Sequence, residues 1–299
     1  MKMLGFIGIG IMGKPMVRNL LKHGYTVTVF DINEEAVRSI ASEGAVPAAS
    51  PKETAKNSDV IFTMLPNSEH VRSVVLGKDG IIEGAKQGAI VVDMSSISPV
   101  VSKELAETLA DRGIDMLDAP VSGGEPKAID GTLAIMVGGK EEVFEKVKPL
   151  LQCMGKDITL VGGNGAGTTV KLANQIMVNV NIAAMSEAIM LAAKAGIDIG
   201  KMYQAVRGGL AGSAVLDAKA PLILARNFQP GGRIDINLKD LTNAIEAAHA
   251  IGAPVPLASQ VLEMFYALKA DGKEGLDHAA LVQYYEKLAN FQVAQPANV

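Results

Sequence analysis

Residues 2–31 read KMLGFIGIGIMGKPMVRNLLKHGYTVTVFD, an order that predicts a strand, a glycine turn, a helix, a second strand and a terminal acid. Gly8 would let the chain turn sharply off the first strand, and Gly13 would let the helix pack close to the sheet. At Gly10 the missing side chain would let backbone N–H groups approach a pyrophosphate, which the helix N-terminus also attracts. The whole stretch predicts a dinucleotide-binding unit, whereas the glycines alone would also fit an ordinary strand-to-helix turn.

The acid at the end of the second strand indicates which dinucleotide binds. Asp31 lies 18 residues after Gly13, where a carboxylate can accept hydrogen bonds from both ribose hydroxyls. A carboxylate also repels a 2′-phosphate, and Ile32 and Asn33 offer no guanidinium to receive one. We therefore expect NAD (NADH) to be favoured over NADP. Arg38 is close by in the sequence, so NADP is kept as the alternative cofactor.

The bulk composition narrows the class of protein. A chain of 299 residues is longer than a single core usually grows, so two domains are expected. Its 48% hydrophobic and 20% charged residues indicate a soluble globular protein, and the net charge of −4 argues against nucleic acid or a membrane surface as partner. Cys153 is the only cysteine, so we expect no disulfide, no metal and a cytoplasmic location.

Strand-like and helix-like segments alternate through the first half of the chain. This alternation, with amphipathic segments such as 34–43 and 99–112, predicts an α/β Rossmann-type domain with a doubly wound, mostly parallel sheet. The predicted strands are 3–7, 26–30, 59–64, 90–93, 115–118, 132–137 and 158–161. Ligands bind such sheets beyond the carboxyl ends of the strands, where the sequence places polar or glycine-rich turns at 64–67, 93–96 and 118–124.

The second half of the chain predicts helices and no further strands. A glycine-rich break at 162–167 separates the halves, so we place an NAD-binding Rossmann domain at 1–164 and an all-helical substrate and oligomerisation domain at 165–299. One long helix is expected from Thr168 to about Ala195. Later helices are predicted at about 199–207, 213–226, 237–251, 255–270 and 277–290, with Ser213, Asp240 and Asp277 as capping or first-turn residues.

The long helix is unusually apolar for a small domain. Its most apolar part, 176–191, is interrupted by Asn179, Asn181, Ser186 and Glu187, which makes it a poor membrane span. It carries more apolar surface than one small domain easily buries. We therefore expect a homodimer or a homotetramer.

An enzyme that reduces a carbonyl needs a proton donor beside the hydride acceptor. The histidines, His23, His70, His249 and His278, all lie outside the glycine-rich and strand-end turns, so surface or partly packed positions are expected for them. Lys171 is the only charged residue between Asp157 and Glu187, and it heads a polar stripe on an apolar helix. The stripe comprises Asn174, Gln175, Asn179 and Ser186, within about 140° of one face at about 100° per residue. We expect Lys171 to be that donor, the alternative being a lysine that extends from the helix end into solvent.

Three further positions carry polar groups toward the expected site. Residues 122–124, Ser-Gly-Gly, offer a hydroxyl and unobstructed N–H groups for a small carboxylate, or form a plain loop. Ser96 could touch the nicotinamide side of the pocket, or cap the helix that starts near Pro99. Lys239 and Asp240, at the predicted start of a helix, would by themselves be taken for a solvated pair.

Four motifs in order resemble the β-hydroxyacid dehydrogenase family. They are GFIGIGIMGKPM at 5–16, DAPVSGG at 118–124, GAGTTVKLANQ at 165–175 and LKDL at 238–241, and the match covers essentially the whole chain. The resemblance implies a Rossmann domain, then an α-helical domain opened by a long interdomain helix, with an active site in the cleft between them.

The resemblance also implies roles for individual residues. Lys171 would be the general acid/base, while Ser122, Gly123 and Gly124 would bind the substrate carboxylate and Asp240 would help to hold the lysines in place. Members often carry asparagine four residues after the lysine; this chain has Gln175 there and Asn174 before it, so either could contact the substrate hydroxyl. The expected cofactor contacts are Gly8, Gly10, Ile11, Met12, Gly13, Asp31, Leu65, Pro66, Ser96 and Lys239.

Two other stretches are similar to one branch of the family. Residues 207–213 (RGGLAGS) and 277–286 (DHAALVQYYE) resemble members that reduce tartronate semialdehyde (2-hydroxy-3-oxopropanoate) to D-glycerate with NADH. The alternative is 3-hydroxyisobutyrate or another short β-hydroxyacid as substrate. A 6-phosphogluconate substrate is less expected, because the chain is short and has no evident basic cluster for a sugar phosphate. A catalytically silent NAD-binding protein is the rival from another class, against which the presence of Lys171 argues.

Overall fold

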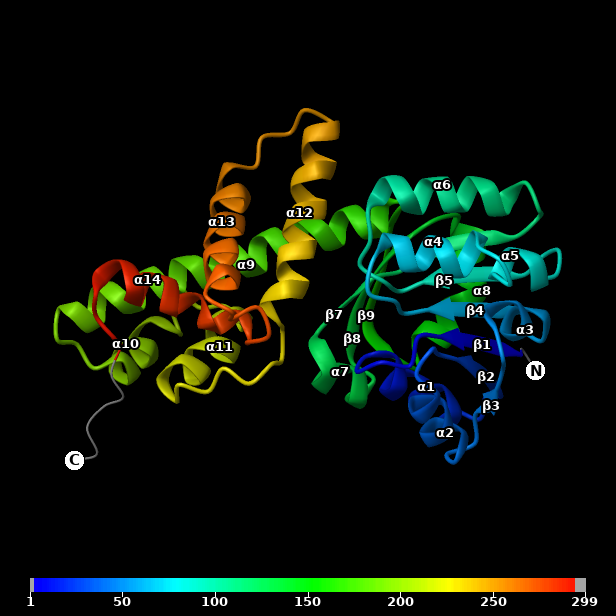
Figure 1. Ribbon diagram of the computed structural model, residues 1–299, viewed down its shortest axis with the longest axis horizontal. Helices are drawn as coiled ribbons and strands as arrows, with labels where there is room; N and C mark the ends of the chain where they lie inside the picture. The colour runs from blue at the N-terminus through cyan, green and yellow to red at the C-terminus, as the bar shows by residue number, and fades with distance from the viewer. Residues whose placement is uncertain (1–2, 294–299) are drawn as a thin grey trace. The chain divides into compact units, whose positions relative to one another are not determined.

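The computed structural model describes residues 3–293 and has two compact units, Met1–Lys171 and Leu172–Val299. The first unit is built on one nine-stranded sheet within the described residues (Figure 1). Its strands are β1 (Leu4–Ile7), β2 (Val27–Phe30), β3 (Val46–Pro47), β4 (Val60–Thr63), β5 (Ile90–Asp93), β6 (Asp115–Asp118), β7 (Val121–Ser122), β8 (Leu133–Gly138) and β9 (Gly155–Gly162). The domain boundary after residue 164 stays a prediction.

The strand order is that of a doubly wound sheet. It runs β3-β2-β1-β4-β5-β6-β8-β7, with β9 paired to β8, and the strands from β1 to β6 are parallel. The antiparallel pairs are β6 with β8 and β7 with β8. The order reverses beside β1, so the carboxyl ends of β1 and β4 form the crevice where such sheets bind ligands. The mostly parallel α/β fold is confirmed.

Helices cover both faces of this sheet. They are α1 (Gly13–Lys22), α2 (Glu34–Ala41), α3 (Pro51–Lys56), α4 (Ser68–Leu76), α5 (Ile81–Gly84), α6 (Pro99–Ala110), α7 (Gly124–Asp130) and α8 (Glu141–Leu151). Neighbouring strand residues point to opposite faces, so Phe6 joins a core with side chains of α1 and α8. Ile7 joins a second core with side chains of α4 and α6. The burial of both faces explains the near-continuous apolar strands.

Three strands differ from their prediction by more than one residue, and one of them, β3 at Val46–Pro47, lies where no strand was predicted. β9 begins at Gly155, three residues before the predicted start, and β7 lies inside the segment expected to be a turn. β7 forms because Val121 pairs with Ile135 and Ser122 with Ala134 of β8. Pairing between segments this far apart leaves no periodic pattern in either one, so the sequence did not reveal it.

The second unit is all-helical in its described residues. It contains most of α9 (Ala166–Lys194), α10 (Ile199–Val206), α11 (Ala214–Leu224), α12 (Ile234–Ala250), α13 (Pro256–Ala270), the 3₁₀ turn η1 (His278–Leu281) and α14 (Val282–Ala289). Among the described residues, α9 alone is long and apolar enough to span a membrane by length and composition. It is nevertheless a core helix, because Ile182 and Ile189 are buried with Phe265 in the core of this unit.

The capping predictions hold at two of three positions. Ser213 caps α11 by accepting from the N–H of Leu216, and Asp277 caps η1 by accepting from the N–H of Ala279. The prediction for Asp240 is wrong, because α12 begins at Ile234 and Asp240 lies buried within it. The helix thus begins three residues earlier than predicted, and the fully buried Ile234 anchors residues 234–236 to the core. The predicted helix at 277–290 is also divided, into η1 and α14.

Candidate active site

The predicted dinucleotide turn joins β1 to α1 as expected. Gly8 has φ +95°, and a Cβ there would lie 2.3 Å from the carbonyl oxygen of Met64. A Cβ at Gly13 would lie 2.0 Å from the carbonyl oxygen of Gly8, so both positions admit only glycine. At Gly10, by contrast, no atom of the described residues lies within 4 Å of a Cβ position. Packing within the described residues therefore gives no reason for glycine at this open position.

Asp31 follows β2 and lies against this turn. Its Oδ2 accepts a 2.6 Å hydrogen bond from the N–H of Ile9, and its Oδ1 accepts a 2.8 Å bond from the N–H of Asn33. The predicted ribose-binding acid is thus held beside the glycine turn. Arg38 forms a 3.2 Å ion pair with Glu34 on the exposed surface of α2. Next to the turn, Ile11 is exposed and Met12 half-buried.

A buried polar cluster at the ends of β4 and β5 supports the neighbouring loop. Thr63 and Ser95 donate hydrogen bonds of 2.7 and 2.6 Å to Oδ1 of Asp93. The Ser95 hydroxyl accepts in turn from the N–H of Leu65, at 2.8 Å. These bonds place Leu65, a predicted cofactor contact, beside Gly8, while Pro66 follows it in the same loop. The sequence analysis placed the 93–96 turn at a strand end, but it did not group Asp93 and Ser95 with Thr63, which lies inside the predicted strand 59–64.

Asp93 carries an unusual carboxyl group. It is completely buried, and its Oδ2 has no hydrogen-bond partner among residues 3–293. Burial raises the pKa of Asp93 to about 6. The hydrogen bonds from Ser95 and Thr63 favour the ionised form and lower the pKa, but their effect is smaller than that of burial. Part of the population at mildly acidic pH therefore carries a proton here.

Replacing Asp93 with asparagine should change how stability depends on pH. The folded pKa lies above the ordinary value of 3.8, so the folded state binds more protons, and the wild-type carboxyl costs stability as the pH rises through about 6. Asp93→Asn removes this cost, so its free energy of unfolding relative to wild type should rise by about 1–2 kcal/mol between pH 5 and pH 8. Urea denaturation of both proteins measures this difference. A difference that is independent of pH would contradict the assignment.

The predicted carboxylate-binding residues lie together in one turn. β7 ends at Ser122, which is half-buried, and α7 begins at Gly124. Gly123 and Gly124 have φ values of +137° and +67°, which side-chain-bearing residues rarely adopt. Ser96 is half-buried in the loop after β5, and the N-cap of α6 is Ser98. Capping of that helix by Ser96, the alternative reading of its role, is therefore wrong.

Lys171 lies in the second turn of α9 and is the last residue of the first unit. Only 7% of it is exposed, so it does not extend into solvent as the alternative required. Two members of the predicted polar stripe, Asn179 and Ser186, are fully buried, and Asn179 donates to the carbonyl oxygen of Gln175 at 2.9 Å. Asn174 donates to Oε1 of Gln175 at 3.0 Å.

A polar group on α12 joins this stripe within the second unit. The amide of Gln175 donates a 2.7 Å hydrogen bond to Oδ2 of Asp240 and lies 3.4 Å from Oδ1 of Asn237. Asp240 also forms a 3.2 Å ion pair with Lys239. Asp240 therefore orients Gln175 and Lys239, both of which the sequence assigned to the site. Asn237, buried at 3% exposure, was missed because its helix was predicted to begin there.

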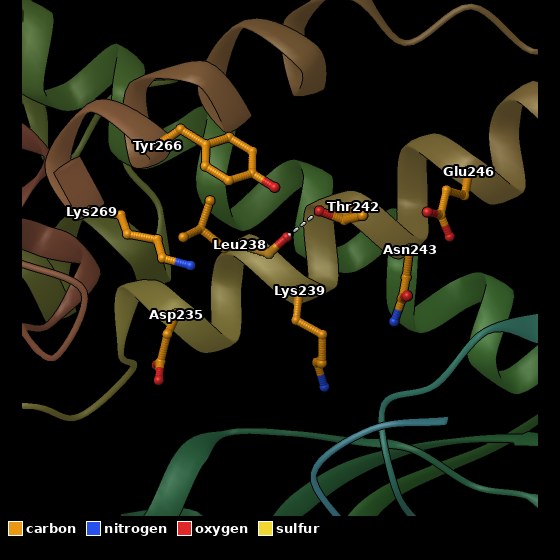
Figure 2. Close-up of a pocket in the computed structure, with 8 residues that line it drawn as sticks. All are labelled: Asp235, Leu238, Lys239, Thr242, Asn243, Glu246, Tyr266 and Lys269. Carbon is orange, nitrogen blue, oxygen red and sulfur yellow. Dashed lines mark hydrogen bonds between the residues drawn. The ribbon is translucent and has the colours of Figure 1, made fainter. Parts of the chain in front are cut away.

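A pocket of about 300 Å³ opens between α12 and α13 (Figure 2). Lys239 lines it, together with Asp235, Leu238, Thr242, Asn243, Glu246, Tyr266 and Lys269. Two lysines and two carboxylates leave its wall without a net charge. Of the predicted site residues, the pocket contains Lys239.

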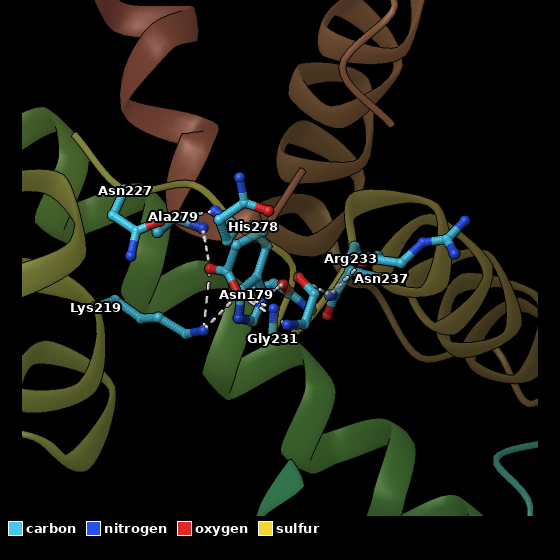
Figure 3. Close-up of polar contacts among 11 residues, drawn as sticks. Asn179, Lys219, Asn227, Gly231, Arg233, Asn237, His278 and Ala279 are labelled. Carbon is cyan, nitrogen blue, oxygen red and sulfur yellow. Dashed lines mark hydrogen bonds and ion pairs between the residues drawn. The ribbon is translucent and has the colours of Figure 1, made fainter. Parts of the chain in front are cut away.

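The second unit also contains a buried charged cluster (Figure 3). Asp277 is fully buried and accepts bonds of 3.0 and 2.9 Å from Lys219, and bonds from the N–H groups of Gly231 and Gly232. Burial and the nearby Lys219 lower the pKa of His278 to about 4, so this histidine is neutral near pH 7. His278 lies 3.2 Å from Oδ1 of Asn179. Its burial corrects the expected surface or partly packed position, whereas His23, His70 and His249 are exposed.

Burial by itself would raise the pKa of Asp277, but the pKa is lowered. Hydrogen bonds from the N–H of Ala279 and from Lys219, together with the positive charge of Lys219, stabilise the ionised form. The cluster fixes the loop before α12 to η1.

Comparisons with known proteins cover almost the whole chain. Residues 3–163 match the family described as the NAD binding domain of 6-phosphogluconate dehydrogenase. Residues 165–285 match the family described as NAD-binding of NADP-dependent 3-hydroxyisobutyrate dehydrogenase.

Individual relatives agree with these matches. The 2-hydroxy-3-oxopropionate reductase of Escherichia coli is 46% identical over 97% of this chain and 99% of its own. The 2-(hydroxymethyl)glutarate dehydrogenase of Eubacterium barkeri is 39% identical over 97% of both chains. A solved Mycobacterium tuberculosis 3-hydroxyisobutyrate dehydrogenase with L-serine has a TM-score of 0.89 at 31% identity, covering 95% of this chain and 99% of that one.

Proposed function

The chain belongs to the β-hydroxyacid dehydrogenase family and is an NAD(P)-dependent oxidoreductase, and we propose that it reduces tartronate semialdehyde to D-glycerate. The observation that carries this choice is the 46% identity, over almost the full length of both chains, to a protein named for this activity. The stretches 207–213 and 277–286 support the same branch of the family.

The proposed chemistry assigns one task to each group of residues. A nicotinamide dinucleotide, when bound, supplies the hydride for the aldehyde carbon. Lys171 gives a proton from Nζ to the aldehyde oxygen as that oxygen gains charge, and is then reprotonated from solvent.

The other polar residues would hold the substrate. The hydroxyl of Ser122 and the N–H groups of Gly123 and Gly124 bind the carboxylate in this proposal, because a turn of this kind presents donors to a small anion. Gln175 is oriented by its bond to Asp240, which favours it over Asn174 as the partner of the substrate hydroxyl. Ser96 and Lys239 remain proposed contacts at the nicotinamide end, and Leu65 and Pro66 remain proposed contacts of the cofactor.

The residues of the glycine turn fit an NAD molecule. Gly10 leaves room for a pyrophosphate, and the carboxylate of Asp31 lies at the turn where a ribose would bind. Arg38, the candidate for a 2′-phosphate, is paired with Glu34. We therefore propose NADH as the preferred cofactor, with NADPH as the weaker alternative.

Replacing Asp31 with alanine should narrow the preference for NADH. The ribose hydroxyls would lose their acceptor and a 2′-phosphate would lose the repulsion, so the ratio of kcat/KM for NADH over NADPH should fall about 10–100-fold. Initial rates with both cofactors at one fixed aldehyde concentration measure this ratio. Glu34→Ala, on the exposed face of the next helix, is the matched control and should have a much smaller effect. An unchanged ratio in Asp31→Ala would show that Asp31 does not contact the ribose.

A substrate panel tests the proposed activity directly. We expect kcat/KM with NADH to be highest for tartronate semialdehyde when it is compared with methylmalonate semialdehyde and other short aldehyde acids. The competing function is that of a 3-hydroxyisobutyrate dehydrogenase, which the similarity to the mycobacterial structure favours. A clear preference for methylmalonate semialdehyde would establish that alternative, and no turnover with any substrate would support a silent NAD-binding protein.

We also propose that the protein is a homodimer or a homotetramer. Met177 and Leu191 on α9 are 61% and 75% exposed, and large exposed apolar side chains on a long helix commonly pack against another subunit. Light scattering of the purified protein reports the mass, and a monomer at micromolar concentration would contradict the proposal.

A further inference from the structure

Asp118 holds the first turn of the helix that carries Lys171. It lies at the end of β6 and is completely buried. Its Oδ1 accepts a 2.7 Å hydrogen bond from the N–H of Gly165, and its Oδ2 accepts a 2.8 Å bond from the N–H of Thr168. The hydroxyl of Thr168 lies 3.2 Å from the same Oδ2. The carboxylate thus binds the amides at the start of α9 from a strand 47 to 50 residues away in the sequence.

This arrangement replaces an ordinary helix cap. The residue before α9 is Gly165, which has no side chain to accept from the first amides of the helix. The carboxylate of Asp118 supplies both the missing acceptor and a negative charge at the positive end of the helix. The start of α9 is therefore fixed to the sheet and not only to its own chain.

The contact leaves the first turn little freedom to move. A Cβ at Gly167 would lie 2.4 Å from the carbonyl oxygen of Met136 and 2.5 Å from that of Asp118. A Cβ at Gly138 would lie 2.6 Å from Oδ1 of Asp118. The first turn of α9 is packed directly against the ends of β6 and β8, so a shift of the helix would break contacts with both strands.

Lys171 follows this fixed turn closely. It lies three residues after Thr168, which in a helix means a rise of about 4.5 Å and a rotation of about 60° from Thr168. Both residues are buried, at 7% and 1% exposure, so the lysine has little room to compensate for a moved backbone. Asp118 also directly precedes the segment that leads to Ser122, so one carboxylate anchors the lysine-bearing helix and the start of the proposed carboxylate-binding turn.

We propose that Asp118 is a positioning residue for Lys171, because its carboxylate fixes the height and rotation of the first turn of α9. The proposal rests on the proposed role of Lys171 as proton donor. It adds that the donor is located by a strand residue of the Rossmann sheet. Asp118 contacts the helix and acts on the reaction through Lys171.

A double-mutant cycle tests this assignment. In the full-length protein with Lys171 present, Asp118→Asn should lower kcat about 10–100-fold, since an asparagine amide cannot accept at both positions and the first turn would shift. In the Lys171→Ala background the same change should lower kcat less than about 3-fold, because no donor remains to be misplaced. The affinity for NADH, titrated by fluorescence, should stay within about 3-fold of wild type in all variants.

The matched control is Asp115→Asn on the same strand. Asp115 forms a solvent-exposed ion pair with Lys140 at 2.8 Å, so its replacement should leave kcat unchanged. If Asp118→Asn does not fold, Thr168→Val takes its place, with an expected loss in kcat of about 3–10-fold when Lys171 is present and less than about 2-fold when it is absent.

Equal losses in the two backgrounds would overturn the positioning role, because a merely structural residue lowers both activities alike. The failure of the proposed function gives a separate result, in which Lys171→Ala by itself keeps near-normal turnover. The first outcome is measured by comparing Asp118→Asn in the two backgrounds, and the second is measured on Lys171→Ala alone, so the two can be distinguished.

Discussion

Replacing Lys171 with alanine is expected to lower kcat about 10²–10⁴-fold while the affinity for NADH survives. The reason is that the lysine donates the proton to the substrate oxygen in the proposed mechanism, whereas the glycine turn and Asp31 hold the cofactor without it. Single-turnover rates at saturating NADH and aldehyde measure the chemical step, and fluorescence titration measures cofactor binding. Near-normal turnover in the variant would remove Lys171 from the mechanism.

Two controls make this experiment specific. Lys194→Ala, at the exposed end of the same helix, should leave kcat within about 2-fold of wild type, because it changes the helix charge but not the donor. Added small primary amines should restore part of the turnover of Lys171→Ala but not of a variant that lost its substrate-binding turn. Failure of amines to raise the rate would favour a role in binding over proton donation.

Replacing Asp277 with alanine is expected to destabilise the protein by about 3–5 kcal/mol. The change leaves Lys219, whose side chain is only 16% exposed, without its counter-charge. It also leaves the N–H groups of Gly231, Gly232 and Ala279 without their acceptor. Urea denaturation followed by circular dichroism gives the free energy of unfolding.

The contribution of the Asp277–Lys219 pair to the free energy of unfolding can be separated into a charge part and a hydrogen-bond part. Lys219→Met removes the buried ammonium with a side chain of similar length, so the double variant Asp277→Ala, Lys219→Met should be more stable than Asp277→Ala alone by about 1–3 kcal/mol. A loss below about 1 kcal/mol in Asp277→Ala would show that the loop before α12 does not depend on this carboxylate. NADH binding should be unaffected, since the cluster lies in the second unit and the glycine turn in the first.

The sequence predicted most of the secondary structure because the segments concerned have strong local patterns. β5 and β6 were predicted with their observed bounds, since each carries apolar residues directly before a polar or glycine-containing turn. The start of α12 was wrong because the residues at 234–236 were not recognised as helical without the burial of Ile234 in the core. A helix end decided by packing has no local signal.

The residues of the candidate site also fall into two groups, those predicted from the sequence and those that only the structure brought together. The sequence predicted site roles for Gly8, Gly13, Asp31, the turn at 122–124 and Lys171, because each combines a distinctive residue type with a place in a strand, turn or helix. The cluster of Thr63, Asp93 and Ser95 was not found, since its members share a site only when β4 and β5 lie side by side. The residues alone predicted Asp240 to be a solvated first-turn residue, whereas it is buried within α12 and accepts a hydrogen bond from Gln175. The ion pair between Asp240 and Lys239 agrees with the resemblance, which implied that Asp240 helps to hold the lysines.

The sequence by itself therefore determined that this chain has a dinucleotide turn, a parallel α/β unit, a helical second half and a lysine on a polar helical stripe. All of these are encoded by residues within about one helix or one strand-turn-helix unit of each other, where periodicity and steric limits act directly. The tertiary structure decided which carboxylates serve as anchors: Asp118 for the start of α9, Asp240 for Gln175 and Asp277 for Lys219. The residues that make these contacts are far apart in the sequence: 47 positions at Asp118, 65 at Asp240 and 58 at Asp277. An acidic side chain looks the same in the sequence whether it is solvated or buried, and only the packing around it decides which donors it meets.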